Sequence, residues 1–226
     1  MKSHSFELSK HFKPKKYKNT YLISFEGIEG SGKSTQILKF SEYLKSMNMR
    51  VHYFREPGGT NFGEKLREVI LESETEIHPL AEANLFAASR AQLLSEKVIP
   101  LLETENRIII LDRYIDSSIA YQGIARGLGM ETILDLHRRY PLNLTPHCTF
   151  YLKIDLETSL KRQQTRGNKK DYFEKENQTF YQSLIDGYNS ASNLFKDRVS
   201  IIDGQKNQEQ VFKQIVSEFN KKVMRI

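Results

Sequence analysis

The feature that most constrains this chain is a glycine-rich turn placed between an apolar segment and a helical pattern. Residues 27–35 read Gly-Ile-Glu-Gly-Ser-Gly-Lys-Ser-Thr, which matches G-x-x-x-x-G-K-[ST] in full. A β-branched and aromatic run at 21–25 precedes the turn, and an apolar pattern of helical period at 35–46 follows it. A strand, a tight glycine turn and a helix in this order indicate an α/β domain built on parallel strands.

The same alternation of strand-like and helix-like segments continues towards the C-terminus. Further strand-like runs lie at 51–54, 108–111, 149–154 and 199–202, and helical periods lie at 64–71, 80–98, 156–162, 179–194 and 208–223. Residues 108–111 are apolar on both sides of the pleat, as in a central parallel strand. The alternation predicts βαβ crossovers and a parallel sheet covered by helices on both faces. The ligand site is expected beyond the carboxyl ends of its strands.

The positive charge of the chain is concentrated in its first 20 residues. The formal net charge is +6, but residues 1–20 contain six of the 34 Lys and Arg and one of the 28 Asp and Glu, so residues 21–226 carry +1. We therefore expect residues 1–20 to be a basic, solvated and flexible extension, and residues 21–226 to form one domain. A charge confined to a tail argues against a nucleic-acid partner for the folded domain.

Apolar run lengths and cysteine content predict a cytoplasmic protein without a membrane partner. The longest aliphatic runs, 98–102 and 108–111, are far shorter than the ~20 residues of a membrane-spanning helix. The N-terminus matches neither a secretory signal nor an Arg-rich transit peptide. Cys148 is the single cysteine in the sequence, which excludes an internal disulfide. No zinc site or thiol nucleophile is expected, because the six His are scattered and Cys148 has no Cys partner.

The glycine-rich motif predicts a phosphate-binding loop. Its glycines allow the backbone N–H groups and the following helix N-terminus to face an anion. Lys33 would add a point charge at the β and γ phosphates, and Ser34 would supply a magnesium ligand. The candidate ATP-binding residues are Gly27, Ile28, Glu29, Gly30, Ser31, Gly32, Lys33, Ser34 and Thr35.

Two further strand ends carry groups suited to a second anion. Arg55 ends the second strand and is followed by Pro57 in a Pro-Gly-Gly turn that allows close approach of a ligand. Asp112 follows the third strand, where a P-loop enzyme places the carboxylate beside its magnesium ion. Arg113 can bind a phosphate through two N–H groups of its guanidinium. The alternatives are a solvated turn at the first position and a surface ion pair at the second.

Helical spacing places two groups of side chains on common faces. Phe86 and Arg90 lie four residues apart, and a ring with a donor fork suits a planar base that carries an exocyclic oxygen. Ser118 and Tyr121 lie three apart, with Gln122 beside them. Each group could also be ordinary core packing.

A basic stretch leaves the predicted helix at 156–162. It contains Arg162, Arg166, Gly167, Lys169 and Lys170. A cationic loop of this kind can close over phosphates and exclude water during transfer. A solvated charged loop is the alternative.

Together these motifs resemble the bacterial-type thymidylate kinases, within the P-loop nucleoside monophosphate kinases. The similarity runs from about residue 21 to the C-terminus and rests on four ordered segments, at 25–35, 55–60, 85–92 and 112–123. The resemblance implies a P-loop NTPase three-layer sandwich with a five-stranded parallel sheet, a homodimer, and transfer of phosphate from ATP with Mg²⁺ to dTMP, giving dTDP for dTTP synthesis. In-line transfer without a covalent intermediate is expected, because none of these side chains is a plausible nucleophile for a relay.

The resemblance also implies roles for the phosphate-facing residues. Lys33 and Ser34 would bind ATP and Mg²⁺, and Asp112 would be the magnesium-side acid. Arg55 and Arg113 would hold the dTMP phosphate, with Pro57 in the same substrate-binding turn. Arg166 would be a lid residue near ATP.

For the nucleoside, the resemblance implies a stacking ring and a set of polar contacts. Phe86 would stack on thymine, and Arg90 would contact a thymine carbonyl. Ser118 would face the base, and Gln122 belongs to the same candidate set. Tyr121 would crowd the 2′ position and Glu29 would face the 3′-hydroxyl.

One segment departs from the family pattern. Members with an acidic residue inside the loop, as Glu29 is here, usually carry a catalytic Arg in the lid, in a pattern like Asp-Arg-Ile-Glu. The lid expected here at about 163–175 reads Asp-Tyr-Phe-Glu at 171–174. Our hypothesis is that Lys169 or Lys170 supplies the missing charge.

Three alternatives stay open from the sequence. The chain could be a P-loop kinase for another monophosphate, or a nucleotide-binding switch that has lost transfer activity. It could also be a nucleic-acid-binding module that uses the Lys-rich tail.

Overall fold

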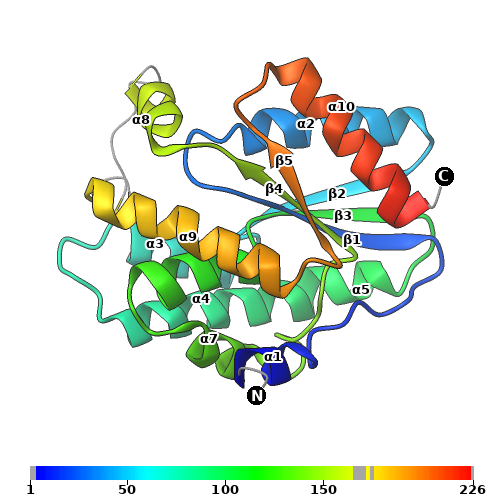
Figure 1. The fold of residues 1–226 in the computed structure, drawn as a ribbon. Coiled ribbons are helices and arrows are strands. Elements are labelled where there is room, and N and C mark those ends of the chain that lie inside the picture. Colours follow the sequence, from blue (N-terminus) through cyan, green and yellow to red (C-terminus); the bar gives the residue numbers. More distant parts are fainter. Residues whose placement is uncertain (1–3, 165–171, 174–175, 225–226) are drawn as a thin grey trace.

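A five-stranded parallel sheet forms the centre of the molecule (Figure 1). The computed structural model describes residues 4–164, 172–173 and 176–224. The strands are β1 (Thr20–Glu26), β2 (Arg50–Arg55), β3 (Arg107–Asp112), β4 (Cys148–Lys153) and β5 (Val199–Asp203), in the order β2-β3-β1-β4-β5. Every neighbouring pair is parallel, as the alternation of segments predicts.

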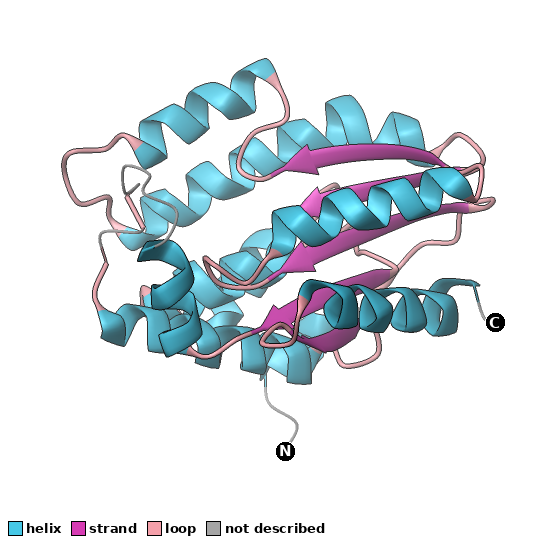
Figure 2. Ribbon diagram, turned by 90° about the horizontal axis from the view of Figure 1, so that it is seen from above, coloured by secondary structure: helices cyan, strands magenta, loops and turns pink. Residues whose placement is uncertain are grey.

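Helices cover both faces of this sheet, which confirms the three-layer sandwich (Figure 2). One face is covered by α2 and α10, and the other by α4, α5 and α9, with α7 packed against α4 on the side away from the sheet. The helices are α1 (His4–Ser9), α2 (Lys33–Ser46), α3 (Asn61–Leu71), α4 (Pro79–Leu93), α5 (Ile99–Leu102), α6 (Ile115–Ser118), α7 (Met130–His137), α8 (Leu156–Gln164), α9 (Gln178–Leu194) and α10 (Gln208–Phe219). Three π-helical turns continue them: η1 (Leu94–Val98), η2 (Ile119–Ala125) and η3 (Asn220–Met224).

The sheet separates two hydrophobic cores, and the side chains of each strand point alternately into one core and the other. Ile108 and Ile110 of β3 face the core beneath α2 and α10, whereas Ile109 and Leu111 face the core beneath α4 and α9. All four side chains are fully buried. Because side chains of a strand alternate between its faces, a strand that is covered twice must be apolar at every position, as the sequence predicted for 108–111.

Strand register brings the polar strand ends to one edge of the sheet. Asp112, the last residue of β3, pairs with Phe25 of β1 on one side and with Arg55 of β2 on the other. The loops that follow these strands therefore start at the same level, and they carry the residues predicted to bind ligand.

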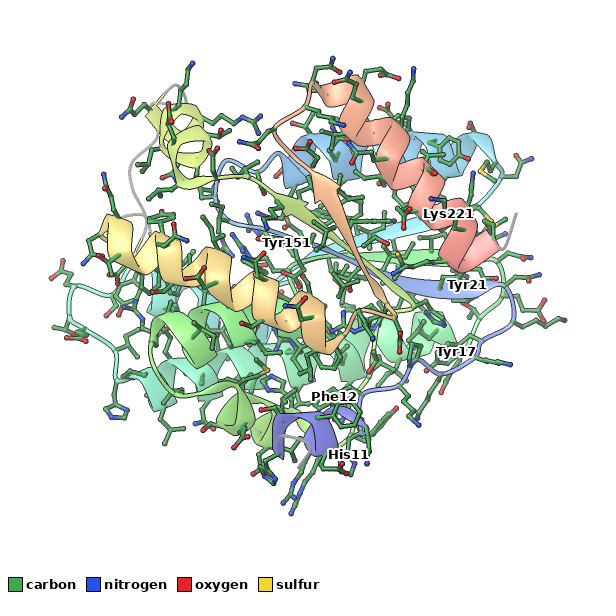
Figure 3. The ribbon with its side chains drawn as sticks, viewed as in Figure 1. His11, Phe12, Tyr17, Tyr21, Tyr151 and Lys221 are labelled. Atoms are coloured by element: carbon green, nitrogen blue, oxygen red, sulfur yellow. The ribbon has the colours of Figure 1, made fainter. Side chains whose placement is uncertain are left out.

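The N-terminal segment differs from the expected solvated extension. Leu8 and Phe12 are 7% and 5% exposed, and the rings of Phe12 and Phe195 form a T-shaped pair with their centroids 5.9 Å apart. Figure 3 labels Phe12 beside helix α1. Ser5 donates from both its backbone N–H and its hydroxyl to Glu131 of α7. The segment is therefore not solvated at Leu8 and Phe12, because both apolar side chains pack against the rest of the domain.

Helix boundaries follow local capping that the periodicity did not reveal. Helix α3 begins at Asn61 rather than at 64, because Thr60 accepts a hydrogen bond from the N–H of Gly63 and caps the helix. Helices α1 and α7 were not among the predicted helical segments. None of the helices in the described part of the chain is long and apolar enough to cross a membrane.

Candidate active site

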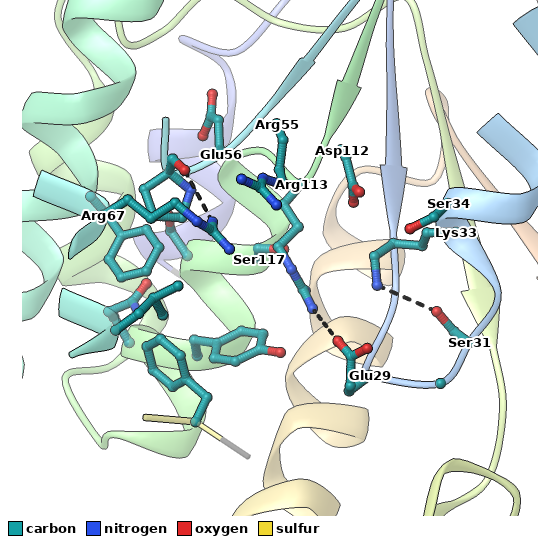
Figure 4. A pocket seen from close by; sticks show the side chains of 18 of the residues that line it. Glu29, Ser31, Lys33, Ser34, Arg55, Glu56, Arg67, Asp112, Arg113 and Ser117 are labelled. Atoms are coloured by element: carbon teal, nitrogen blue, oxygen red, sulfur yellow. Dashed lines mark hydrogen bonds and ion pairs between the residues drawn. The ribbon is translucent and has the colours of Figure 1, made fainter. Parts of the chain in front are cut away.

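One cavity of about 390 Å³ opens at the carboxyl edge of the sheet, and most of the predicted site residues line it. The lining residues from the glycine-rich loop are Glu29, Gly30, Ser31, Gly32, Lys33 and Ser34. The other strand ends contribute Arg55, Glu56, Pro57, Asp112 and Arg113. The helices and the segment before α9 contribute Arg67, Leu71, Phe86, Ser117, Ser118, Tyr121, Gln122, Phe173 and Tyr181. Figure 4 shows Asp112 between the arginines on one side and Lys33 with Ser34 on the other.

The loop turns sharply out of β1 because Gly27 adopts a positive φ of 142°. A Cβ at Gly27 would lie 2.7 Å from the carbonyl oxygen of Leu152, so a larger residue would displace the backbone. The turn ends at Gly32, and α2 starts at Lys33. Ile28 is buried in the core rather than facing the cavity, and Thr35 lines a second cavity. The rest of the motif curls around the cavity as a phosphate-binding loop does.

Lys33 is held inside this loop by its own backbone. Its Nζ donates to the carbonyl oxygens of Gly27 at 2.9 Å and Ile28 at 3.3 Å, and to Oγ of Ser31 at 3.5 Å. Burial, helped by the positive charge of Arg113, lowers the pKa of Lys33 to about 8. An anion in the loop would favour the charged ammonium and raise this pKa again.

Ser34 and Asp112 supply the oxygen donors predicted for a metal ion. Both line the cavity, and the Asp112 side chain also accepts a hydrogen bond of 3.4 Å from the hydroxyl of Tyr53. The described residues contain no group of three or more His, Cys, Asp or Glu that could hold a metal by itself. A hydroxyl and a carboxylate fit Mg²⁺, which takes oxygen ligands and usually completes its shell with water and substrate phosphate.

Arg113 has an unusual backbone and a fixed guanidinium. Its φ is +72°, which is uncommon for a residue other than glycine and points to a functional constraint. Its Nη1 donates to the hydroxyl of Tyr188 at 2.9 Å and to the carbonyl oxygen of Gly27 at 3.1 Å. The guanidinium also lies 5.1 Å from the ring centre of Tyr121 and 3.8 Å from the Glu29 carboxylate.

Arg55 and Arg67 add two more cations to this part of the cavity. Arg55 is exposed at the end of β2 and has no ion pair with a described residue. Arg67 comes from α3, and its Nη1 donates to the carbonyl oxygen of Pro57 at 3.1 Å. Figure 4 shows both on the same side as Arg113, so three guanidinium groups face one end of the cavity.

The far end of the cavity is aromatic and polar. Phe86 of α4, Tyr121 of η2 and Phe173 form a ring cluster. The centroid of the Phe173 ring lies 6.1 Å from that of Phe86 and 5.2 Å from that of Tyr121. Gln122 donates from Nε2 to Glu82, whereas its Oε1 is buried and has no hydrogen-bond partner among the described residues. A planar ligand with an N–H donor at its edge would fit this end.

Helix α6 and the π-helical turn η2 carry Ser118, Tyr121 and Gln122 to one wall of the cavity, because residues three and four apart share a helix face. The backbone N–H of Arg126 bonds to the carbonyl oxygen of Tyr121, five residues earlier. The wider turn begins at Tyr121, so Tyr121 and Gln122 lie at its start, beside the cavity. π-Helical turns are rare and are frequent at functional sites.

Arg90 was predicted to contact the ligand, but it is not among the cavity-lining residues. It is 1% exposed and lies behind the wall, where its Nε and Nη2 both contact Glu56 Oε2 at 2.6 Å. Every other predicted substrate-binding residue lines the cavity: Glu29, Arg55, Pro57, Phe86, Arg113, Ser118, Tyr121 and Gln122.

The expected lid lies mostly outside the described residues. Arg166, Lys169 and Lys170 are among those for which no structure is described. Tyr172 stands where the family pattern has its Arg. Its hydroxyl accepts the N–H of Ile77 at 3.2 Å, and its ring lies under the guanidinium of Arg126. Tyr172 is thus anchored beside the aromatic end of the cavity.

A second cavity adjoins the outer side of the glycine-rich loop. It shares Gly30, Ser31 and Gly32 with the first and is otherwise lined by Thr35, Gln36, Arg162, Gly204, Lys206, Asn207, Gln208 and Val211. Arg162 joins α8 to this wall by donating to the carbonyl oxygens of Gly30 at 3.1 Å and Gly204 at 3.0 Å.

Six lining residues were not among the predicted site residues: Glu56, Arg67, Leu71, Ser117, Phe173 and Tyr181. Glu56 stands in the quoted 55–60 segment and Phe173 in the expected lid, so both carried a signal that was not used. Arg67 lies on α3, and which face of α3 points to the cavity depends on how this helix packs against α4. No local sequence pattern predicts that packing.

Comparison with known proteins shows the family of this chain. A family model described as thymidylate kinase matches residues 25–215. The chain belongs to the thymidylate kinase family. Thymidylate kinases from Kosmotoga olearia and Thermosipho africanus are 40% and 44% identical to it over 87% and 86% of this chain, and over 94% and 95% of their own lengths. The thymidylate kinase of Acholeplasma laidlawii is 42% identical over 89% of this chain and 99% of its own.

A solved structure supports the same assignment. The crystal structure of thymidylate kinase from Ehrlichia chaffeensis superposes with a TM-score of 0.71 at 28% identity, covering 89% of this chain and 99% of that one. The protein is therefore a nucleoside monophosphate kinase, a phosphotransferase of nucleotide biosynthesis with a P-loop for ATP.

Proposed function

We propose that the enzyme phosphorylates dTMP to dTDP, with ATP and Mg²⁺, by direct in-line transfer of the γ-phosphoryl group. The observation that carries this proposal is one cavity with Lys33 and Ser34 on one side and the Arg55, Arg67 and Arg113 cluster on the other. Two anionic groups held at these ends would meet near Asp112. Phosphoryl transfer depends mainly on such positioning and on electrostatic stabilisation.

On the donor side, the loop backbone and Lys33 bind the β and γ phosphates of ATP. The ammonium of Lys33 would exchange its carbonyl partners for phosphate oxygens, which are stronger acceptors for it. Ser34 and Asp112 would hold Mg²⁺, which when bound neutralises charge on the phosphates. The second cavity would take the remainder of ATP, beside Arg162 and Thr35.

On the acceptor side, Arg55 and Arg113 bind the phosphate of dTMP, and Arg67 adds charge from α3. The guanidinium of Arg113 is already held by Tyr188 and Gly27, so it meets the phosphate without a large reorientation. Fixed donors of this kind stabilise developing charge at little reorganisation cost.

The aromatic end accommodates thymine. Phe86 would stack on the base, Oε1 of Gln122 would accept the thymine N3–H, and the Ser118 hydroxyl would donate to a carbonyl of the base. Cytosine has an acceptor at N3 instead, so the same Oε1 disfavours it. Tyr121 would crowd a 2′-hydroxyl, and Glu29 would face the 3′-hydroxyl.

The lid proposal rests on the sequence alone. Lys169 or Lys170 would supply the transition-state charge that other members take from a lid Arg, and Arg166 would lie near ATP. If this is correct, Lys169→Ala and Lys170→Ala lower kcat singly or together. An unchanged kcat in both single variants and in the double variant would contradict it.

Three further proposals follow from the family resemblance. The enzyme is a homodimer, it acts in the cytoplasm, and residues 21–226 form the kinase domain. Sedimentation equilibrium of the full chain tests the dimer, for which a monomer at micromolar concentration would be the contradictory result.

The test of the proposed function is a coupled ADP-release assay with ATP and Mg²⁺. Parallel reactions contain dTMP, dUMP, dCMP, UMP or no acceptor, and one dTMP reaction contains excess EDTA. We expect ADP release that depends on dTMP and on the divalent ion. Release with another acceptor alone would indicate a different monophosphate kinase, and no release would favour a nucleotide switch.

A further inference from the structure

A buried polar cluster lies behind the wall that we assign to the base. Its centre is the guanidinium of Arg90, and its other members are Glu56, Ser118 and His137. Ser118 is 2% exposed, Glu56 is 3% exposed, and Arg90 and His137 are 1% exposed. Glu56 and Ser118 also line the cavity, so the cluster reaches the ligand through them.

The hydrogen bonds of Arg90 fix its orientation completely. Nε and Nη2 are 2.6 Å from Oε2 of Glu56. Nη1 is 2.9 Å from Oγ of Ser118 and 2.7 Å from Nε2 of His137. These two contacts use both hydrogens of Nη1. The guanidinium also lies 5.0 Å from the ring centre of Tyr114.

The tautomer of His137 follows from these contacts. A guanidinium can donate but cannot accept, so Nε2 of His137 must be the acceptor. The proton is then on Nδ1, which lies 2.8 Å from the carbonyl oxygen of Ile133 and donates to it. The imidazole is therefore neutral and bridges helix α7 to Arg90 of α4.

Burial and the charge of Arg90 keep the imidazole neutral. Together they lower the pKa of His137 to about 3, against a weaker opposing effect from the bond to Ile133. Among the charged groups of the cluster, Glu56 contacts the far side of the guanidinium and does not contact His137. The acceptor at Nε2 is thus present at neutral pH.

The orientation of Arg90 determines which atoms the wall presents. Because Arg90 donates to Oγ of Ser118, that oxygen acts as an acceptor there, and its own hydrogen is directed to a different group. Arg90 also donates to Oε2 of Glu56, whereas Oε1 of Glu56 has no hydrogen-bond partner among the described residues. A rotated guanidinium would change both wall groups together.

We propose that His137 is a positioning residue of the acceptor site, which holds Arg90 so that Ser118 and Glu56 present fixed polar atoms to the base. This inference rests on the proposed function, since it assigns the wall beside Ser118 to the nucleoside monophosphate. His137 acts through Arg90 and does not touch the ligand. Without it, one buried N–H of Arg90 has no acceptor, and rotation of the guanidinium relieves that cost.

The test compares three variants of the full-length enzyme. His137→Leu keeps the bulk and removes the acceptor, whereas His137→Gln keeps an acceptor oxygen near the position of Nε2. His147→Leu is the control: His147 is a half-buried histidine with two hydrogen bonds, to the N–H of Leu22 and the carbonyl oxygen of Lys15, but it does not line the cavity. Tm, kcat, and KM for dTMP and for ATP are measured in each.

We expect His137→Leu to raise the KM for dTMP about tenfold, which is the usual effect of losing one hydrogen bond to a charged group. The KM for ATP stays within about twofold, because the donor side shares no residue with the cluster. His137→Gln restores most of the dTMP affinity, and His147→Leu lowers Tm without changing either KM. An unchanged KM for dTMP in His137→Leu, or equal impairment in His137→Gln, would overturn the proposal.

A second measurement needs no destabilising variant. Long-range ¹H–¹⁵N spectra of the unmodified enzyme report the tautomer of each histidine, and His137→Gln assigns the resonances. We expect a neutral His137 ring protonated at Nδ1. Protonation at Nε2 would contradict the inference, because that nitrogen could not then accept from Arg90. If the unmodified enzyme shows no dTMP-dependent activity, the proposed function fails, whereas normal activity with an unaffected His137→Leu variant refutes this inference alone.

Discussion

The guanidinium of Arg113 lies 3.8 Å from the carboxylate of Glu29, and this ion pair joins the two halves of the active site. Glu29 belongs to the glycine-rich loop that we propose binds ATP, and Arg113 belongs to the strand end that we propose binds the acceptor. The same guanidinium donates to the carbonyl oxygen of Gly27. The glycine-rich loop thus positions the Arg113 guanidinium, and in the proposed function this couples the donor side to the acceptor side.

Replacement of Arg113 by Lys should impair the enzyme strongly. A lysine keeps the charge but cannot contact Tyr188, Gly27 and a phosphate together, so we expect kcat/KM for dTMP to fall about 100-fold. Steady-state kinetics with dTMP as the varied substrate provide the measurement, and Arg139→Lys, at an exposed position, is the matched control. A loss below about threefold would show that Arg113 does not contact the acceptor phosphate.

The lowered pKa of Lys33, about 8, predicts a pH-dependent affinity for ATP. Phosphate binding favours the charged ammonium and raises this pKa, so the free enzyme takes up a proton when ATP binds above about pH 8. ATP affinity should therefore fall as the pH rises through 8. Calorimetry at about pH 8.5 in two buffers of different ionisation enthalpy counts the protons. Zero uptake there would contradict the assignment.

The ring of Tyr121 should control discrimination against ribonucleotides. We expect Tyr121→Phe to retain the preference for dTMP over its ribonucleotide, because the ring still occupies the space near the sugar. Tyr121→Ala should reduce the ratio of the two kcat/KM values about tenfold or more. If Tyr121→Phe removed the preference as well, the hydroxyl rather than the ring would be responsible.

The N-terminal segment should contribute stability without contributing to catalysis. Phe12→Ala removes a ring that packs on Phe195, and we expect a loss of about 2 kcal/mol or more in the free energy of unfolding. Phe6→Ala is the control, since Phe6 is 40% exposed. Denaturant unfolding measures the effect, and kcat and KM should not change. Equal stability in the two variants would show that the docked segment is not energetically coupled to the domain.

Much of this fold is predictable because its signals are local. Residues 108–111 indicated a doubly covered central strand by composition alone, and the turn at Gly27 indicated where the first strand ends. The packing of Leu8 and Phe12 was missed because the lysines around them dominate the composition of the segment. Two apolar residues gain a partner through tertiary contacts that no local pattern records.

The site was predictable where chemistry is concentrated at strand ends, as at Asp112 and Arg113. It was less so where a side chain has two plausible directions. Arg90 and Phe86 share a helix face in sequence, yet Phe86 lines the cavity whereas Arg90 lies behind the wall, because Glu56 and His137 hold its guanidinium there. His137 stands far from both in the chain and gave no signal of its own.

The most direct test of the whole account is product identification after a single turnover. Enzyme in excess over dTMP is mixed with ATP and Mg²⁺, the reaction is quenched in acid, and nucleotides and protein are separated. We predict dTDP and ADP in equal amounts, with no phosphate on the protein at any time. ADP without dTDP, or phosphorylated protein that appears before dTDP, would contradict direct transfer between two nucleotides held in one cavity.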